Sequence, residues 1–497
     1  MPRNAAGGLD KEQKPELDDA PITNRQSFSV IDSIRHIWST LGLPLGALKS
    51  LQLIDDDRHY ASSFKIDDLA HTTIALSALA AALVWSTRTR SEMPTVSIAK
   101  EHACAEFVSE RIYTVDGKHL PSTFNAIGGL HKTADGHVRM HDGFPHHRNN
   151  ALKNLGLRED ATRDAVAAQI LKWKSIDLET AAFKNGAVIV ALRSFDEWDA
   201  LSQAKAVPDF PITVRRFDSA NPPVPPPSRS RPRDACLRGM RIVELSRVIA
   251  APVAGRTLAA HGADVIWVTS PTLPNQPELD IDTARGKRTV QLDIKKTDEK
   301  ARLLELVRTA DVFMSSYRPG SLAAQDFSPE DLAKINPNLV VATLNAWGDE
   351  GPWAKNRGFD SLVQTASGIN VVEAEHHGQG EPSRVLPCQA LDHGSGYLLA
   401  TGIMAALYKR ERHGGVYEVH VSLAGTMKYL RSLGQAPENI LGRSDFPKTE
   451  ALEEFMESRN SAFGNLKAIT HSARIDGVSV GYTTMPKPLG SDDPVWL

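Results

Sequence analysis

The chain has 497 residues, more than a single hydrophobic core usually holds, so two or more domains are expected. Apolar residues make up 41% and charged residues 24%, a balance typical of a soluble globular protein. The 57 basic and 60 acidic side chains nearly cancel, which gives no basic excess for nucleic-acid binding.

Cysteine usage and the N-terminus indicate the compartment. Cys104, Cys236 and Cys388 are far apart and form no CxxC pair, so they supply neither a disulfide framework nor a zinc site. Residues 1–20 lack the apolar core of a signal peptide, and the apolar run 74–85 is too short to span a membrane, so it predicts a buried helix. We expect a cytoplasmic protein with no membrane or nucleic-acid partner.

An internal repeat connects the two halves of the chain. Residues 70–88 read AHTTIALSALAAALVWSTR, and residues 392–410 read DHGSGYLLATGIMAALYKR. The stretches align without a gap, share the second-position histidine and the final arginine, and each precedes a β-rich run. These shared features favour a diverged duplication over two unrelated Ala-rich helices. Residues 1–120 are therefore interpreted as a degenerate partial copy of the large domain.

A smaller unit is expected at residues 121–218. The segment 131–140 predicts a β-hairpin closed at Asp135–Gly136, and helical stretches follow it. Five histidines crowd this unit without acidic or cysteine ligands at set spacing, so we expect them at the surface and expect no metal site. They are His131, His137, His141, His146 and His147.

A proline-rich linker follows at 219–236. Residues 219–232 read SANPPVPPPSRSRP, which favours extended polyproline geometry and cannot hold a packed core. The linker separates the N-terminal part from a C-terminal part at 237–497.

The C-terminal part alternates strands with helices. Short β-rich runs at 240–245, 264–268, 289–293, 312–314 and 339–343 have helical stretches between several of them. The first helix, at 253–260, has Pro252 near its start and Gly262 just past its end. The alternation predicts an α/β fold with a Rossmann-like parallel sheet, without the GxGxxG loop of a dinucleotide fold.

An ordered set of short motifs runs through the same part. It comprises GMRIVEL at 239–245, RGKRTVQLD at 285–293, YRPG at 317–320, INPNL at 335–339, GFD at 358–360, and Asp392 with its helix. Together these residues resemble the family III (CaiB/BaiF) acyl-CoA transferases over 237–497. The resemblance implies a Rossmann-like large domain, a smaller α+β domain and an interlocked ring-like dimer. In this duplicated chain we expect a homodimer or an intrachain pseudo-dimer.

The resemblance also implies a reaction. Family members move CoA from an acyl-CoA thioester to a free carboxylic acid through a covalent aspartyl intermediate, with no permanently bound cofactor. Asp392 matches the carboxylate nucleophile; its local sequence alone favours a helix N-cap, and the resemblance reverses that preference. We expect the helix dipole to favour its ionised form, and Gly394 and Gly396 to offer oxyanion donors.

For CoA binding the resemblance points to the turn after the first strand and to several cations and polar groups. The residues are Val248, Ile249, Ala250, Lys287, Arg288, Ser316, Tyr317 and Arg357. A solvated loop is the alternative for Lys287 and Arg288. Ser270 and Ala324 stand where many members have an arginine, which would weaken phosphate recognition.

Two alternatives stay open. An α-methylacyl-CoA racemase has the same fold and needs a histidine and an aspartate, but the matching segment here is Gly358–Phe359–Asp360, and phenylalanine cannot take a proton. A non-catalytic family member is favoured by the two absent arginines and opposed by Asp392 with its glycines. Transfer is the preferred hypothesis.

Overall fold

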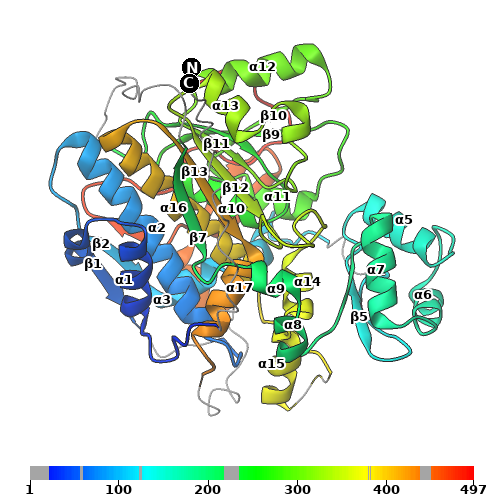
Figure 1. The fold of residues 1–497 in the computed structure, drawn as a ribbon. Helices are drawn as coiled ribbons and strands as arrows, with labels where there is room; N and C mark the ends of the chain where they lie inside the picture. Colours follow the sequence, from blue (N-terminus) through cyan, green and yellow to red (C-terminus); the bar gives the residue numbers. More distant parts are fainter. Residues whose placement is uncertain are drawn as a thin grey trace, which may run out of the picture.

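The computed structural model describes residues 22–55, 60–121, 126–217, 234–378, 380, 382–436 and 449–497. Most of the predicted linker, at 219–233, lies outside these residues. A large α/β body carries a smaller lobe at one side, drawn in cyan and green in Figure 1.

A seven-stranded sheet forms the centre of the large body, in the order β10-β9-β8-β11-β12-β13-β7. Its first six strands are parallel, which confirms the predicted α/β class with a Rossmann-like sheet. They are β8 (Arg241–Leu245), β9 (Asp264–Thr269), β10 (Arg288–Gln291), β11 (Val312–Ser315), β12 (Val340–Asn345) and β13 (Val416–Ser422). Numbered along the chain, their order is 3-2-1-4-5-6, so connections leave β8 and β11 in opposite directions. The carboxyl ends of these two strands therefore frame a crevice where such sheets bind ligands.

The seventh strand comes from before the linker. β7 (Ile212–Phe217) pairs antiparallel with β13 at the edge of the sheet. The segment 121–218 thus completes the sheet of the segment 237–497, and the boundary at the linker does not divide the molecule in space.

Helices cover both faces of the sheet. Ile242 and the next residue, Val243, belong to different cores, as period-two alternation requires. The core with Ile242 includes α10 (Ala250–Ala260) and α16 (Ala390–His413), and the core with Val243 includes α12 (Thr297–Arg308) and α13 (Pro329–Ile335). Gly262, at φ +94°, ends α10 as predicted.

The two helices of the proposed duplication pack against each other. α2 (Ile66–Thr89) and α16 each have 24 residues. By length and composition α2 could cross a membrane, but 89% of its most apolar window is buried inside the protein, so the predicted buried helix is confirmed. The following strands differ: β13 joins the large sheet, whereas β2 (Val96–Ala99) joins a separate three-stranded sheet.

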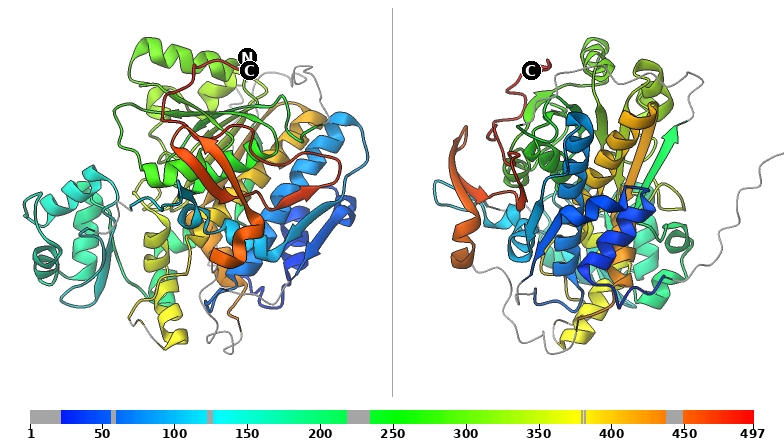
Figure 2. Two further views of the ribbon diagram at one scale, coloured as in Figure 1. Left: turned by 180° about the vertical axis from the view of Figure 1, so that it is seen from behind. Right: turned by 90° about the vertical axis from the view of Figure 1, so that its left-hand side faces the viewer.

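The two ends of the chain are interleaved. β2 lies between β1 (Leu51–Ile54) and β16 (Ala473–Ile475), and β15 (Gly464–Ile469) lies between β14 (Met456–Ser461) and β3 (Thr114–Val115). Figure 2 shows these red C-terminal strands beside the blue and cyan N-terminal segments. The other helices of this body are α1 (Val30–Thr40), η1 (Leu45–Ser50), α3 (Lys100–Glu106), α4 (Ser109–Ile112), α11 (Pro277–Thr283), η2 (Ala323–Gln325), α14 (Asp360–Ala366), α15 (Ile369–His377), α17 (Leu423–Ser432) and η4 (Thr449–Phe455).

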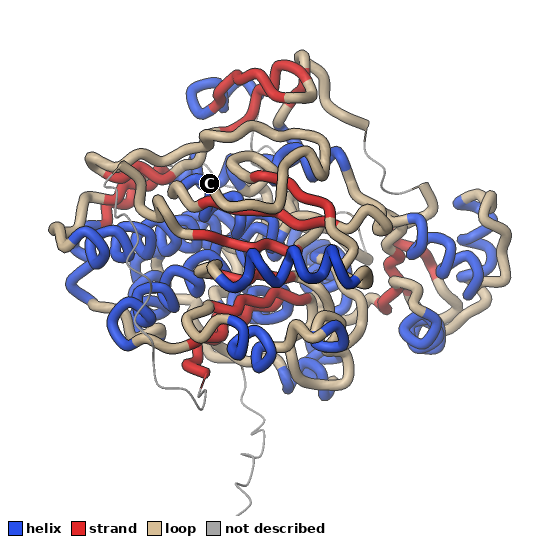
Figure 3. Tube along the Cα trace, turned by 90° about the horizontal axis from the view of Figure 1, so that it is seen from above, coloured by secondary structure: helices blue, strands red, loops and turns tan. Residues whose placement is uncertain are grey.

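The smaller lobe has its own core. Its antiparallel sheet contains β4 (Gly129–Lys132), β5 (His137–Met140) and β6 (Ile189–Ala191), with the predicted hairpin between β4 and β5. Helices α5 (Pro145–Asn154), α6 (Arg163–Ile170) and α7 (Ser175–Asn185) pack on this sheet, and α8 (Phe195–Asp199) and α9 (Ser202–Ala206) lead back to β7. Seen from above in Figure 3, the lobe stands to one side of the body.

Candidate active site

Asp392 lies where two cavities meet. A cavity of about 480 Å³ and another of about 400 Å³ share three lining residues, Val248, Phe359 and Asp392. Asp392 is in the first turn of α16 and is 7% exposed. No described residue hydrogen-bonds to its carboxyl oxygens, whereas buried polar groups are normally paired, so this carboxyl is available to a ligand.

The electrostatics of Asp392 differ from the expectation. Burial, followed by the neighbouring carboxylates Asp360 and Glu110, raises the pKa of Asp392 well above its ordinary value. The prediction that the helix N-terminus favours the ionised form is wrong, because desolvation and like charges outweigh the dipole. A strongly perturbed carboxyl in a cavity is typical of a reactive group.

Asp360 takes up the free N–H groups at this helix end. Its Oδ2 accepts hydrogen bonds from the backbone N–H of Leu391 (2.8 Å) and of Asp392 (3.0 Å), and its Oδ1 accepts one from Gln364. Burial raises the pKa of Asp360 to about 6. The cap fixes α16 and holds a second carboxyl beside the first.

The two glycines after Asp392 do not form an oxyanion loop. Gly394 and Gly396 lie inside α16, where backbone N–H groups bond to carbonyls one turn earlier. A Cβ on Gly396 would lie 2.5 Å from the carbonyl oxygen of Ala250 on α10, and one on Gly394 would lie 3.1 Å from Leu69 on α2. Both glycines therefore serve close helix packing, which corrects the prediction.

The N-terminal part reaches the site through Glu110. Its Oε2 lies 2.9 Å from Nε2 of the buried His393, the residue after Asp392. Burial acts to raise the pKa of Glu110, but His393 and Arg111 outweigh it and the net pKa is lowered. Glu110 therefore stands as an anion in the larger cavity.

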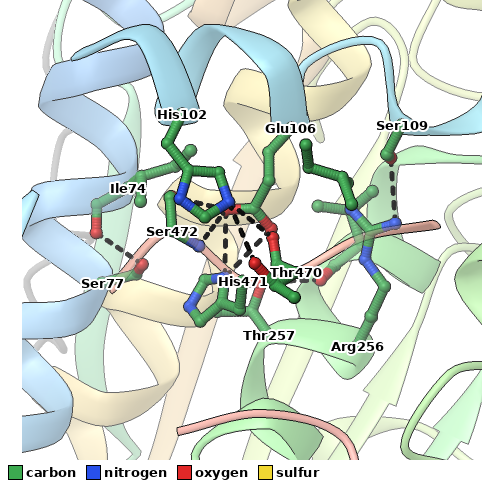
Figure 4. Close-up of polar contacts among 12 residues, drawn as sticks. Ile74, Ser77, His102, Glu106, Ser109, Arg256, Thr257, Thr470, His471 and Ser472 are labelled. Atoms are coloured by element: carbon green, nitrogen blue, oxygen red, sulfur yellow. Dashed lines mark hydrogen bonds and ion pairs between the residues drawn. The ribbon is translucent and has the colours of Figure 1, made fainter. Parts of the chain in front are cut away.

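A buried polar network fixes the segment that carries Glu110. The Glu106 carboxylate accepts hydrogen bonds from Nδ1 of His471 (3.0 Å) and from the N–H (2.9 Å) and hydroxyl (2.6 Å) of Ser472. Arg256 on α10 donates to Ser109 (2.9 Å; Figure 4). Ser109 in turn donates to Asp282 (2.8 Å). Groups from both chain ends thus hold α3 and α4 against α10.

The smaller cavity opens at the carboxyl ends of β8 and β11. Of the predicted CoA-binding residues, Val248, Ala250, Ser316, Tyr317 and Arg357 line this cavity, and Val248 and Ile249 line the larger one. Val248 has φ +75°, a strained conformation for a β-branched residue, and such strain clusters at functional sites.

Three arginines around the smaller cavity lack a carboxylate partner among the described residues. Arg247 stacks on Phe144 and donates to the carbonyl of Pro274, and Arg318 donates to the carbonyl of Lys355 (3.2 Å). Burial, followed by Arg318, lowers the pKa of Arg357. Clustered guanidinium groups without counter-charges are a site for an anion such as a phosphate. Sequence reasoning missed Arg247 and Arg318, although each follows a strand at the topological switch point.

Lys287 and Arg288 lie elsewhere. Lys287 is fully buried in an ion pair with Glu244 (2.8 Å), and Arg288 forms an ion pair with Asp264 (2.8 Å). Neither residue lines the cavities described here. The prediction that they bind CoA phosphates is therefore wrong, and so is the solvated-loop alternative.

The two absent arginines do not leave this region neutral. Ser270 lines a third cavity, of about 290 Å³, which also includes Arg247 and Tyr317 and so adjoins the smaller cavity near Asp392. Ala324 is exposed on η2. Arg247 and Arg318 supply positive charge to this region, and the sequence analysis did not identify either as a candidate for CoA binding.

The histidines of the lobe are not all at the surface. His131, His141 and His147 are buried, which corrects the prediction. His141 stacks on Phe359 at 3.8 Å between ring centroids. Burial lowers the pKa of His141 to about 4 and that of His147 to about 2, so both are neutral at physiological pH. No group of three metal-ligating side chains occurs within the described part of the chain.

Fold and site together define an α/β protein with a ligand crevice at a topological switch point, ending at a buried carboxyl. Residues 237–437 match the family model for CoA-transferase family III. Within this segment the chain is similar to CoA-transferase family III, the CaiB/BaiF family.

Individual relatives match over part of their length. A probable fatty acyl-CoA transferase of Mycobacterium tuberculosis is 32% identical over 227 residues, covering 43% of this chain and 57% of that protein. An acetyl-CoA:oxalate CoA-transferase of Acetobacter aceti is 32% identical over 227 residues, covering 42% and 58%. A crystal structure of a hypothetical protein from M. tuberculosis is similar at 31% identity with a TM-score of 0.36, covering 40% and 57%. The chain therefore spans a little more than half the length of these relatives.

Proposed function

We propose that the protein is an acyl-CoA transferase that moves CoA from an acyl-CoA thioester to a free carboxylic acid. The observation that carries the proposal is the cavity at the switch point. Among the described residues, its three arginines have no carboxylate partner, and the carboxyl of Asp392 at its end accepts no hydrogen bond. Phosphates of CoA would occupy the arginine end and the thioester would lie at Asp392.

In the proposed mechanism Asp392 is the nucleophile. Its carboxylate attacks the donor thioester, which forms a mixed anhydride and releases the CoA thiolate. The thiolate attacks the aspartyl carbonyl, which forms an aspartyl–CoA thioester and releases the donor acid. The acceptor carboxylate then runs these two steps in reverse, leaves as its CoA thioester and restores Asp392. No metal or permanently bound cofactor takes part in these steps.

The larger cavity would hold the acyl group. It lies on the other side of the junction formed by Val248, Phe359 and Asp392, away from the arginines of the smaller cavity. Its volume of about 480 Å³ lies within the range of small-molecule pockets. Donor acid and acceptor acid would exchange through this space while CoA stays bound.

The N-terminal part would complete this site within one chain. α2 packs on α16, Glu110 reaches the larger cavity, and the lobe supplies the cavity wall at His141. We propose that the N-terminal part is a degenerate copy that makes the chain an intrachain pseudo-dimer of the family's interlocked arrangement. A monomeric mass in light scattering would support this; a dimer would favour the homodimer. The buried free cysteines are consistent with a cytoplasmic location.

A direct assay tests the function. Labelled CoA thioesters of short-chain acids are mixed with an unlabelled acid, and the new thioester is followed by chromatography, for the wild type and for Asp392→Asn. We expect transfer by the wild type and none by Asp392→Asn. Absence of transfer across a broad panel, with no CoA binding, would favour the non-catalytic alternative.

One observation favours the racemase as the second candidate. Neutral His141 lies against Phe359 in the cavity that Asp392 also lines, so the site contains an imidazole although residue 359 is not histidine. Solvent deuterium incorporation at the α-carbon of a 2-methylacyl-CoA, lost in His141→Gln, would support proton transfer. Absence of deuterium incorporation would exclude the racemase and leave CoA transfer as the proposed reaction.

A further inference from the structure

The N-terminal part places an ionised acid in the cavity of the proposed nucleophile. Glu110, on α4, lines the larger cavity together with Asp392, and its side chain is 5% exposed. An ionised carboxylate only accepts hydrogen bonds, so Nε2 of His393 donates the 2.9 Å bond to Oε2 of Glu110. Nε of Arg111 lies 3.3 Å from the other carboxylate oxygen. Glu110 is therefore an anion in a fixed orientation.

His393 connects this acid to the turn that carries Asp392. It is the next residue of α16, and its side chain is fully buried and stacks on Phe107 at 5.4 Å between ring centroids. Successive residues of a helix do not face each other, and His393 lines neither of the two cavities that Asp392 lines. His393 therefore acts on the site through the helix and through Glu110.

Two further hydrogen bonds hold the segment around Glu110 against α11. Ser109 donates to the carboxylate of Asp282 (2.8 Å), and the hydroxyl of Tyr113 donates to the backbone carbonyl of Glu278 (2.7 Å). These bonds tie the residues on both sides of Glu110 to the C-terminal part of the chain. A charge that is fixed before the reaction needs no reorganisation to act on a buried neighbour.

We propose that Glu110 is a positioning residue for Asp392, contributed by the N-terminal part of the chain: its hydrogen bond with His393 orients the turn that presents the nucleophile, and its fixed negative charge faces that carboxyl. The proposal rests on the transfer reaction proposed above and adds a residue to it. Nucleophilicity rises with basicity, so a nearby anion makes the ionised carboxyl a stronger nucleophile. The N-terminal part would then contribute to catalysis as well as to packing.

Glu110 is one of two acids whose charge acts on Asp392. Burial and then the carboxylates of Asp360 and Glu110 raise the pKa of Asp392. The other ionisable groups that line the larger cavity are Arg111, Tyr113, His119, Arg139, His141, Asp142, Glu278 and Cys388. Those of the smaller cavity are His146, His147, Arg247, Tyr317, Arg318 and Arg357. Because Asp360 also caps α16, Glu110 is the acid whose charge can be removed without disturbing that cap.

Two substitutions separate the charge of Glu110 from its hydrogen bond. Glu110→Gln keeps an oxygen that accepts from His393 but removes the charge, so the acidic limb of the kcat/KM profile should move to lower pH. Glu110→Ala also removes the hydrogen bond, so its kcat should be about 10-fold below that of Glu110→Gln, with little change in KM.

The matched control is Glu106→Gln. It removes a buried acid of the preceding helix α3 that also bonds to a histidine, His471, but lines neither cavity at Asp392. Glu106→Gln should lower the free energy of unfolding and leave the acidic limb at its wild-type pH. This control separates the charge beside Asp392 from a general loss of buried hydrogen bonds.

Chemical labelling of Asp392 separates this proposal from the proposed function. A carbodiimide with an added amine converts protonated carboxyl groups to amides, so the extent of labelling against pH reports ionisation without any substrate. The tryptic peptide 385–409 contains Asp392 and no other acidic side chain, so mass spectrometry follows this carboxyl alone. We expect the labelling midpoint of Glu110→Gln to lie at lower pH than that of the wild type.

A lower midpoint in Glu110→Gln supports the role of the charge even if the wild type shows no transfer, a result that would contradict only the transferase. An unchanged midpoint in Glu110→Gln, or an equal shift in Glu106→Gln, would overturn the electrostatic role. Equal kcat values for Glu110→Ala and Glu110→Gln would overturn the positioning role.

Discussion

The carboxylate of Asp360 accepts a hydrogen bond from the backbone N–H of Asp392 at 3.0 Å, so one acid caps the helix turn that presents the other. The cap holds the proposed nucleophile in place. It also brings a like charge close to it, which contributes to the raised pKa of Asp392. Positioning and pKa are thus coupled through a single side chain.

The pH dependence of the reaction should report this pair. Asp360→Asn keeps an oxygen acceptor for the N–H groups but removes the charge, so the pKa of Asp392 should fall. We expect the acidic limb of the kcat/KM profile to move to lower pH in Asp360→Asn. An unchanged limb would contradict the coupling.

Stability should change in the same variant. A folded-state pKa above the unfolded value means that the folded state binds more protons between the two values, so wild-type stability falls as pH rises through that window. The window for Asp360 runs from the ordinary carboxyl pKa to about 6. In urea unfolding, the free energy of unfolding of Asp360→Asn should fall less than that of the wild type as pH rises through this window. An identical fall in the two proteins would show that ionising the buried Asp360 carboxyl does not destabilise the fold.

The arginines of the smaller cavity should bind CoA. Replacing Arg318 or Arg357 by glutamine removes a guanidinium–phosphate hydrogen bond, so the Kd for CoA should rise about 10-fold or more for each variant. The wild-type affinity should fall as salt increases, and less steeply so in the variants. Titration of CoA at low and high salt measures both effects. Arg158→Gln is the charge-matched control, and variants that bind like it would remove the arginines from the CoA site.

Lys287 should affect stability and not CoA binding. Lys287→Met leaves Glu244 buried without its partner, so we expect a loss of about 3–5 kcal/mol in the free energy of unfolding. Adding Glu244→Gln should recover most of that loss. CoA titration of the folded protein is the discriminating measurement: a large rise in Kd with normal stability would restore the sequence-based assignment.

Gly396 should matter for packing. In Gly396→Ala the added Cβ would clash with the backbone oxygen of Ala250. We therefore expect the free energy of unfolding, measured with urea, to fall by about 1–3 kcal/mol. Gly394→Ala is the matched comparison, because its Cβ meets side-chain atoms at 3.1 Å and 3.2 Å that can shift. Native stability with abolished transfer in Gly396→Ala would instead support the oxyanion role.

Local patterns predicted several elements of the large body and of the lobe. The β-rich run at 240–245 is β8, Gly262 ends α10, and the hairpin at 135–136 is present, because each depends on residues close in sequence. The α/β class follows from the alternation of such elements.

Long-range pairings were not accessible in the same way. Glu110 and His393 are 283 residues apart, and β7 pairs with β13 from the other side of the linker. No local sequence pattern predicts either contact. The family resemblance predicted Lys287 at the CoA phosphates, whereas Glu244, 43 residues away, holds it in a buried ion pair. The proposal that Asp392 is the reactive carboxyl rested on the family resemblance. Its pKa is raised by burial and then by Asp360, which the sequence did not place beside it.

Intact-protein mass spectrometry after mixing with acyl-CoA donors tests the central claim most directly. The account predicts an adduct on the wild type that is released by hydroxylamine, maps to the peptide containing Asp392 and is absent in Asp392→Ala. The same adduct on Asp392→Ala, or none on a wild type that catalyses transfer, would contradict covalent catalysis by Asp392.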